Sequence, residues 1–463
     1  MIKTNKSVNR ISLDIDCTPF ELFSSIPLSS GSILLESTMP SHELGKRSII
    51  VTKPKSTLIF FDNSFIEIIN NTVKKINTPT LEYIRQILDE NKINYKDNTF
   101  CGGLVGYISY DLGCSFENVH LTKPKQTLLP EMFLGVYEWG LVFDHNIQKW
   151  EMIGICDLQP HVEFINDIHP KITQPYKSRF PKFQPNLDPD EQKLTSNFTY
   201  NEYLNSVVKA KEYILEGDIY QVNLTQQFSA TVDTGPLDIY KRLRETNPAP
   251  FSAIIVVDDN NFILSSSPEL FLYVNDKNVE TRPIKGTIPR GKNRQEDERM
   301  KKLLLNSEKD FAELVMITDL ERNDLNRVCE TGSVLVPELK MLESYASVHH
   351  LVSRVIGKMK PEKDIIDLLQ STFPGGSITG APKIRAMQII NELEPHRRGV
   401  YTGTIGYISF NYIAILNIAI RTLTYESGKI TIGVGGGIVV DSIPEKEYEE
   451  TLHKGTAIFK AFR

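Results

Sequence analysis

Two pairs of acidic residues at helical spacing are the first candidates for chemistry in this chain. Asp310 and Glu313 precede an apolar run, and Glu447 and Glu450 lie near the start of a C-terminal helix. Residues three apart share one face of a helix, so each pair presents two carboxylates together. If the two faces converge, they form an all-oxygen site suited to Mg²⁺. The alternative is a solvated acidic cluster, which is common at helix N-termini.

Two segments rich in small residues could bind an anion. A glycine run near the C-terminus follows a strand-like segment and contains Gly435, Gly436 and Gly437, whose backbone N–H groups can approach an anion closely. The sequence FPGGSITGAPK carries Thr379 just before a predicted helix, whose N-terminal amides could also hold a carboxylate or phosphate. A plain tight turn and a well-capped helix are the structural alternatives.

Three basic side chains lie where burial would alter their chemistry. Arg421 sits in the apolar sequence NIAIRTLTY, so its guanidinium needs an anion, either a structural carboxylate or a bound one. Lys285, in RPIKGTIPRG, would be a nucleophile or base if partly desolvated, and otherwise an exposed turn lysine. His349 and His350 are adjacent, so in a strand only one of them can face a given cavity.

Composition limits the classes of function. The chain has 463 residues, with 52 Lys and Arg against 58 Asp and Glu, a net charge of −6 that favours no nucleic-acid surface. Its five cysteines are scattered without a CxxC pair, which indicates neither a disulfide framework nor a zinc site. We find no signal peptide or apolar run of membrane-spanning length, so we expect a cytoplasmic protein that does not enter a membrane.

Periodicity predicts both helices and strands. We expect strands at 48–52, 57–61 and 134–142, paired strands at 253–257 and 261–265, and helices at 81–88, 206–215, 296–324 and 365–369. Strand pairs adjoin in sequence, which favours an α+β fold over alternating βαβ units. Six prolines between Pro160 and Pro189 indicate a connector, so we divide the chain into regions 1–155, 156–195 and 196–463.

Ten segments from about residue 200 onward resemble the chorismate-utilising enzymes in order and spacing. That family includes anthranilate, aminodeoxychorismate, isochorismate and salicylate synthases. The segments are GDIYQVNLTQQF, NPAPFSA, SSSPELF, RPIKGTIPRG, DLERNDLNRV, VHHLVSRVIG, FPGGSITGAPK, RRGVYTGTIGY, IAIRTL and GVGGGIVVDS. The resemblance implies a four-layer α/β/β/α arrangement, with two orthogonally packed β-sheets and helices outside. Residues 196–463 would be the chorismate-binding catalytic region, and residues 1–155 resemble the family's first region more faintly.

Two positions separate the branches of this family. Lys285 stands where the anthranilate, isochorismate and salicylate synthases typically carry alanine in a PIxGT motif. Gln221 stands where the isochorismate and salicylate synthases usually have a lysine base. The resemblance therefore implies Mg²⁺-dependent amination of chorismate at C4, on the route to 4-aminobenzoate and folate. The alternatives are anthranilate synthesis and an inactive, tryptophan-sensing protein on the same scaffold.

The resemblance also assigns roles to residues at matching positions. Lys285 would attack C2 of chorismate, Glu269 would protonate the departing C4 hydroxyl, and His350 would be the active-site histidine. Thr379 and the amides of the glycine run would support the ring carboxylate, while Arg421 and Tyr407 would hold the enolpyruvyl carboxylate. For Mg²⁺, the expected direct ligands are Glu313 and Glu450, with Asp310 and Glu447 acting through water.

The family also suggests a second pocket and separate partners. The sequence SILLES, with Leu35, Glu36 and Ser37, resembles a segment that lines a tryptophan pocket in relatives, although it could equally be a buried strand. The chain has no glutamine-hydrolysing nucleophile motif, so we expect a separate glutamine amidotransferase subunit to supply ammonia. We likewise expect a separate lyase to act on the product.

Overall fold

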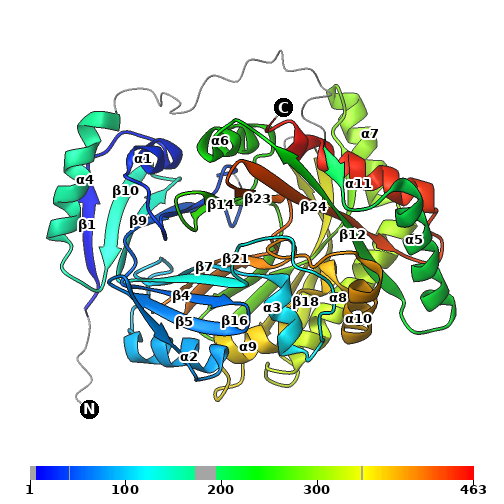
Figure 1. Cartoon of the computed structure of the whole chain (residues 1–463), viewed down its shortest axis with the longest axis horizontal. Helices are drawn as coiled ribbons and strands as arrows, with labels where there is room; N and C mark the ends of the chain where they lie inside the picture. The colour runs from blue at the N-terminus through cyan, green and yellow to red at the C-terminus, as the bar shows by residue number, and fades with distance from the viewer. Residues whose placement is uncertain (1–6, 41, 173–193, 346–347, 463) are drawn as a thin grey trace.

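The computed structural model describes residues 7–40, 42–172, 194–345 and 348–462, which form two twelve-stranded antiparallel sheets. Figure 1 shows the sheets as two layers with helices on their outer sides. The first sheet contains, in spatial order, β1 (Asn9–Leu13), β10 (Lys149–Gly154), β9 (Trp139–Asp144), β3 (Arg47–Val51), β2 (Ile33–Glu36), β13 (Phe251–Val256), β14 (Asn261–Ser267), β23 (Thr422–Glu426), β24 (Lys429–Ile438), β12 (Gln221–Thr231) and β11 (Thr195–Ser196), with β20 (Gly380–Ala381) beside β12.

The second sheet is built in the same way. It contains, in spatial order, β17 (Ile284–Pro289), β19 (Val348–Lys358), β16 (Asn278–Arg282), β15 (Leu270–Asn275), β22 (Ile413–Asn417), β21 (Thr404–Ser409), β7 (Gly103–Ile108), β8 (Met132–Tyr137), β4 (Ser56–Phe61), β5 (Ser64–Ile69) and β6 (Thr72–Lys75), with β18 (Leu335–Ser344) beside β19. The predicted α+β class with helices outside two sheets is therefore confirmed.

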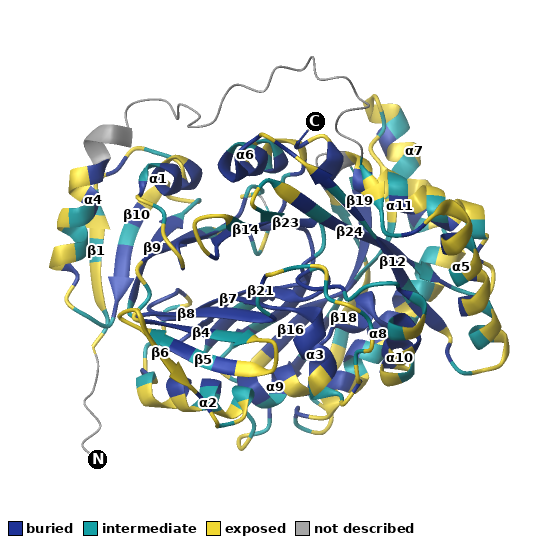
Figure 2. Cartoon of the chain, viewed as in Figure 1, coloured by how far each residue is buried: buried dark blue, intermediate teal, exposed yellow. Residues whose placement is uncertain are grey.

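The helices cover these sheets and bury one side each, as the exposure in Figure 2 shows. They are α1 (Pro19–Ser25), α2 (Thr80–Asn91), α3 (Tyr110–Phe116), α4 (Gln159–Ile172), α5 (Tyr200–Leu215), α6 (Pro236–Thr246), α7 (Arg294–Leu305), α8 (Glu308–Asn326), α9 (Ile365–Thr372), α10 (Lys383–Leu393) and α11 (Pro444–Phe459), with a short 3₁₀ turn, η1 (Gly376–Ile378). Within the described ranges, no helix is both long and apolar enough to span a bilayer.

Strands from both ends of the chain share each sheet. β2 pairs with β13 in the first sheet, and β7 pairs with β21 in the second. The regions 1–155 and 196–463 thus build the two sheets together. The division of the chain into three regions stays a prediction. α4 lies at the start of the predicted connector, and residues 173–193 lie outside the described residues.

Two predicted elements are each split in the structure. The helix predicted at 296–324 breaks into α7 and α8, because the Ser307 hydroxyl accepts the Asp310 N–H at 3.2 Å and caps a new helix. The strand predicted at 134–142 divides at Glu138 into β8 and β9, which belong to different sheets. Both runs look continuous in sequence because the same type of apolar pattern, helical in the first run and strand-like in the second, stands on both sides of the break.

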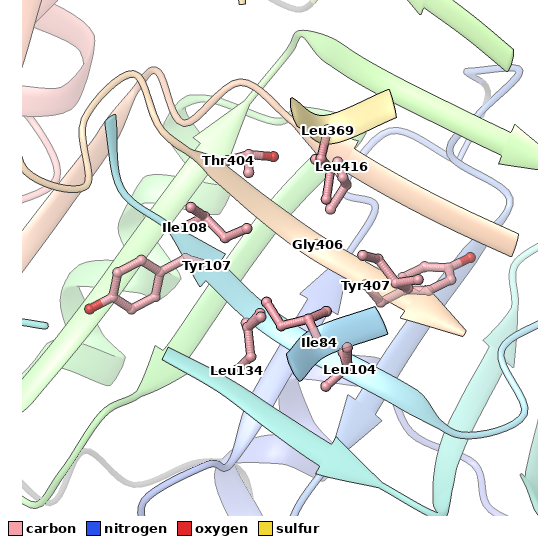
Figure 3. A pocket seen from close by; sticks show the side chains of 12 residues that line it. Ile84, Leu104, Tyr107, Ile108, Leu134, Leu369, Thr404, Gly406, Tyr407 and Leu416 are labelled. Carbon is pink, nitrogen blue, oxygen red and sulfur yellow. The ribbon is translucent and has the colours of Figure 1, made fainter. Parts of the chain in front are cut away.

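A small cavity near the second sheet has a mostly apolar lining. Figure 3 shows this cavity of about 20 Å³, which is lined by residues of α2, α9, β7 and β21 such as Ile84, Leu104, Leu369 and Gly406. A buried water needs two to four polar partners, which this lining does not offer. We interpret the cavity as a packing defect with no binding role.

A buried ion pair joins the second half of the chain to the first sheet. Glu394 and Arg398, 3% and 4% exposed, are paired at 2.7 Å just after α10. Arg398 also donates to the carbonyls of Ile378 at 2.8 Å and Asn223 at 2.7 Å, and the Thr225 N–H donates to Glu394 at 2.9 Å. The pair therefore fixes η1 against β12.

We predict that Glu394→Gln destabilises the protein by about 3–5 kcal/mol, because it leaves the Arg398 charge buried without a counter-ion. The matched control is Glu392→Gln on the same helix, where a half-exposed carboxylate lies 3.8 Å from Lys209. Its cost should be about 0–1 kcal/mol. Thermal and denaturant unfolding measure both, and equal stability of the two variants would show that the buried pair is not a support of the fold.

Candidate active site

A bulge in the second sheet directs Lys285 inward. The register between β17 and β19 shifts between Lys285 and Thr287, and Gly286 at this point has φ +75°. A β-carbon on Gly286 would lie 2.9 Å from the Asp310 β-carbon, so only glycine lets α8 approach here. The bulge re-aims the lysine, whose Nζ donates to the Ser377 carbonyl at 2.9 Å.

The surroundings of Lys285 shift the pKa of its amine. The side chain is half-buried, and desolvation lowers the pKa of its amine. The nearby carboxylates of Glu313, Glu269 and Glu450 oppose this change without reversing it. A lysine with a lowered pKa can act as a nucleophile near neutral pH.

Glu269 lies between β14 and β15 and supplies an acid next to that amine. It is buried, and its backbone is fixed by bonds from its own N–H to the Ser267 hydroxyl and from the Ile418 N–H to its carbonyl. Burial raises the pKa of its carboxyl group, while Ser377 and Lys285 lower it. A carboxyl group with a raised pKa can hold a proton for donation.

Strand alternation separates the two adjacent histidines. His349 contacts the Ser344 hydroxyl at 2.8 Å and Asp297 at 3.0 Å, away from Lys285. His350 instead contacts the Thr287 hydroxyl at 2.8 Å and the Arg421 guanidinium at 3.2 Å. Burial and Arg421 hold the pKa of His350 well below its usual value, so the imidazole is neutral.

Arg421 presents a guanidinium without a carboxylate partner. It immediately precedes β23, with φ +50°. Among the described residues, no carboxylate forms an ion pair with it, and burial lowers its pKa. A buried guanidinium in this state can bind a carboxylate of a ligand through its two parallel N–H groups.

The two predicted carboxylate pairs come from two helices that approach each other. Asp310 and Glu313 lie on α8, which packs on β17 and β19, while Glu447 and Glu450 lie on α11, which packs on β24. Burial raises the pKa of Glu313; Lys285 and Lys309 oppose this, and Asp310 and Glu450 add to it. Because Glu450 adds to the raised pKa of Glu313, α11 places at least one carboxylate close enough to α8 to affect its charge.

These oxygens suit a hard cation, although their lone pairs have other partners here. Glu450, 47% exposed, pairs with Lys454 at 2.7 Å, and Glu447 accepts the Ser442 hydroxyl at 2.6 Å. Within the described ranges, no three acidic, histidine or cysteine side chains are grouped closely enough to hold a metal. The carboxylates of Asp310 and Glu450 repel that of Glu313. These oxygen ligands nevertheless fit Mg²⁺, whose positive charge would relieve the repulsion.

The glycine run lies in a strand, so the tight turn offered as its structural alternative is wrong, while anion binding by its amides stays a prediction. Gly435, Gly436 and Gly437 are extended in β24 and pair with residues 223–225 of β12. A β-carbon on Gly436 would lie 3.3 Å from a Glu450 oxygen, and one on Gly437 would overlap the Gln221 amide. The glycines therefore make room for polar side chains.

In the described part of the chain, several buried polar atoms beside this strand have no hydrogen-bond partner. They are Gln221 Oε1, Asn223 Oδ1 and Thr225 Oγ1. An unpaired buried polar group costs free energy, so such a group of atoms is typical of a ligand site. Thr379 supports the same region, because its hydroxyl donates to the Gly375 carbonyl at 2.9 Å and stabilises η1.

Tyr407 does not lie beside Arg421, so its predicted role is wrong. Its ring packs edge-on against Phe100 at 5.5 Å and lines a different cavity. Tyr401, six residues earlier, was missed: it lies against Gly433, where a β-carbon would meet its ring at 2.3 Å, and close enough to Glu269 for that carboxylate to affect its pKa. The RRGVYTG motif contains both this tyrosine and Arg398, which was the available signal.

The second cavity, about 450 Å³, lies between the two sheets. Leu35 and Glu36 line it, together with Phe251 and Tyr407. The Glu36 carboxylate is occupied, because it pairs with Arg244 at 2.6 Å and accepts the Tyr240 hydroxyl at 3.1 Å. Ser37 is buried beside Ser48 and is not part of the lining. Tryptophan binding here stays a prediction.

Comparison with known proteins identifies the family. Residues 32–460 match the model of the chorismate binding enzymes. The chain is 39% identical to aminodeoxychorismate synthase component 1 of Escherichia coli K12 and 38% identical to anthranilate synthase component 1 of Aquifex aeolicus, covering 93% of this chain each and 92% and 89% of those proteins. The crystal structure of anthranilate synthase component I from Streptococcus pneumoniae TIGR4 superposes with a TM-score of 0.77 at 32% identity, covering 89% of this chain and 92% of that one. The chain belongs to the chorismate-binding enzyme family.

Proposed function

We propose that this protein aminates chorismate at C4 and releases 4-amino-4-deoxychorismate, an intermediate on the route to 4-aminobenzoate and folate. The observation that carries this proposal is the half-buried Lys285 amine, with a lowered pKa, beside the protonatable Glu269. Relatives named aminodeoxychorismate synthase component 1, from Escherichia coli and Klebsiella aerogenes, support the same reading.

The chemistry requires one nucleophile and one acid. The neutral Lys285 amine attacks C2 of chorismate, the diene shifts, and the C4 hydroxyl leaves as water with the proton of Glu269. Ammonia then adds at C4, the diene shifts back, and the bond from C2 to the lysine nitrogen breaks. Glu269 recovers a proton from the added ammonia. A covalent intermediate replaces one difficult displacement by two easier ones.

The remaining polar groups would bind and orient the substrate. Arg421 would hold the enolpyruvyl carboxylate through paired N–H groups, with Tyr401 rather than Tyr407 nearby. The ring carboxylate would lie near Thr379 and β24. Glu313 and Glu450, with Asp310 and Glu447 through water, would hold Mg²⁺, which supplies charge neutralisation and orientation of that carboxylate.

The competing function is anthranilate synthesis, because relatives named anthranilate synthase component 1 are almost as similar in sequence. Ammonia would then attack C2 directly. Lys285 disfavours this reading, because a nucleophilic amine at this position would attack C2 in place of ammonia. The two functions share the substrate and differ in the product.

We predict that Lys285→Ala forms little or no 4-amino-4-deoxychorismate while still binding chorismate, because only the nucleophile is removed. Turnover should fall by about a hundredfold or more, with a much smaller change in KM. Slow formation of a 2-amino product would match direct attack by ammonia. Chromatography with mass spectrometry identifies the products.

Lys292→Ala is the matched control, since this lysine is exposed on the loop after β17. It should behave as wild type. If Lys285→Ala aminated C4 at the wild-type rate, the nucleophile role would be refuted.

We predict that Glu450→Gln abolishes turnover at ordinary Mg²⁺ concentrations, because it keeps the shape of the side chain but removes one charge from the expected metal site. Glu449→Gln removes the same charge from the exposed face of α11 and should leave the Mg²⁺ dependence unchanged. Initial rates across a Mg²⁺ titration measure both. A normal Mg²⁺ dependence in Glu450→Gln would remove Glu450 from the site.

The source of ammonia is the remaining part of the proposal. The relatives carry the designation component 1, which supports a separate glutamine amidotransferase subunit, and a separate lyase would consume the product. We predict that the purified chain uses ammonium salts efficiently and glutamine hardly at all, as measured by product formation with each nitrogen source. Efficient use of glutamine by the chain alone would contradict this. Its cytoplasmic location stays a prediction.

A further inference from the structure

Glu321 is a buried acid that the proposed reaction does not use. It lies on α8, two turns after Glu313, and is 3% exposed. Its Oε1 accepts the Gly376 N–H at 3.1 Å. Its Oε2 has no hydrogen-bond partner among the described residues. Burying a carboxylate oxygen without a hydrogen-bond partner costs free energy, so the presence of a glutamate at this buried position needs an explanation.

The turn that Glu321 contacts is the one that holds Lys285. Gly376 opens η1, and the next residue, Ser377, accepts the Lys285 amine on its carbonyl at 2.9 Å. A β-carbon on Gly376 would lie 2.7 Å from Leu320 and 3.2 Å from the Glu321 oxygen, so helix and turn are in direct contact. The Glu321 carboxyl group is therefore one residue away from the acceptor of the proposed nucleophile.

The charges around Glu321 leave it without a counter-ion. Lys383 is the nearby cation, but its Nζ pairs with Asp324 at 2.5 Å and donates to the Thr372 carbonyl at 2.9 Å. Burial, then Asp324, raises the pKa of Glu321 to about 8, with Lys383 opposing and Glu269 adding to the effect. Below that pH the group is a neutral acid.

We propose that Glu321 is a positioning residue whose side chain holds the Gly376 amide and thereby fixes the Ser377 carbonyl on which the Lys285 amine rests. Its effect on turnover rests on the proposed function, whereas its effect on the amine of Lys285 does not. A neutral Glu321 carboxyl group would also leave the charge state of the Lys285 amine undisturbed. An ionised Glu321 would add a negative charge near Glu269 and next to the turn that holds the Lys285 amine, which would favour the ammonium form of the lysine.

The test compares three variants of the full chain. Glu321→Gln keeps an acceptor for the Gly376 N–H without charge, whereas Glu321→Leu and Glu321→Met remove it at similar volume. Asp319→Asn, on an exposed position of the same helix, is the control. The first readout is the pH dependence of Lys285 acetylation by acetic anhydride, followed by mass spectrometry without chorismate. The second is kcat and KM for amination with ammonium.

We expect Glu321→Gln and Asp319→Asn to match wild type within about threefold in both readouts. Glu321→Leu and Glu321→Met should loosen η1 and admit water to the lysine. Their acetylation should therefore begin at higher pH, and kcat should fall by about tenfold or more with little change in KM. Circular dichroism verifies the fold, and Glu321→Met substitutes if Glu321→Leu does not fold.

Two outcomes would overturn the proposal. Wild-type acetylation profiles in both apolar variants would show that Glu321 does not position the lysine. Equal damage in Glu321→Gln and the apolar variants would show that the ionised carboxylate is required. If amination itself were absent in wild type, the proposed function would fail while the acetylation comparison still decided the role of Glu321.

Discussion

Desolvation of a single amine is the constraint on which the arrangement of this site depends. Lys285 must lose enough water for its pKa to fall, yet two carboxylates close to it, Glu313 and Glu269, favour the charged form. The balance holds only if the amine has a neutral acceptor, the Ser377 carbonyl, and if that acceptor is rigid. Gly286 and the bulge in β17 bring the lysine to this acceptor.

The two sheets supply parts of the site that no local segment could assemble. β17 carries the lysine, the junction of β14 and β15 carries the acid, and β12 and β24 supply the wall of small and polar residues. The helices α8 and α11 bring acidic side chains from opposite sheets. The buried pair of Glu394 and Arg398 fixes η1 to β12, so the acceptor of the lysine amine is fixed to the first sheet.

Sequence alone was sufficient where chemistry follows from local pattern. The α+β class, the helix at α5, the pairing of β13 with β14 and the opposite orientation of His349 and His350 all follow from periodicity or alternation. Sequence failed where a long-range contact decides. Whether Tyr401 or Tyr407 enters the site depends on which face of the second sheet each occupies, and the extended glycines of β24 depend on pairing with β12. Glu321 was invisible because its significance lies in its contact with η1.

The most direct test of the covalent role of Lys285 is a trapping measurement. The protein is mixed with chorismate and Mg²⁺ in the absence of ammonia, quenched in acid, digested and analysed by mass spectrometry. The mechanism predicts a peptide containing Lys285 with the added mass of chorismate minus water, which disappears when an ammonium salt is added before quenching. An unmodified Lys285 peptide in a sample that turns over once ammonium is supplied would contradict the mechanism.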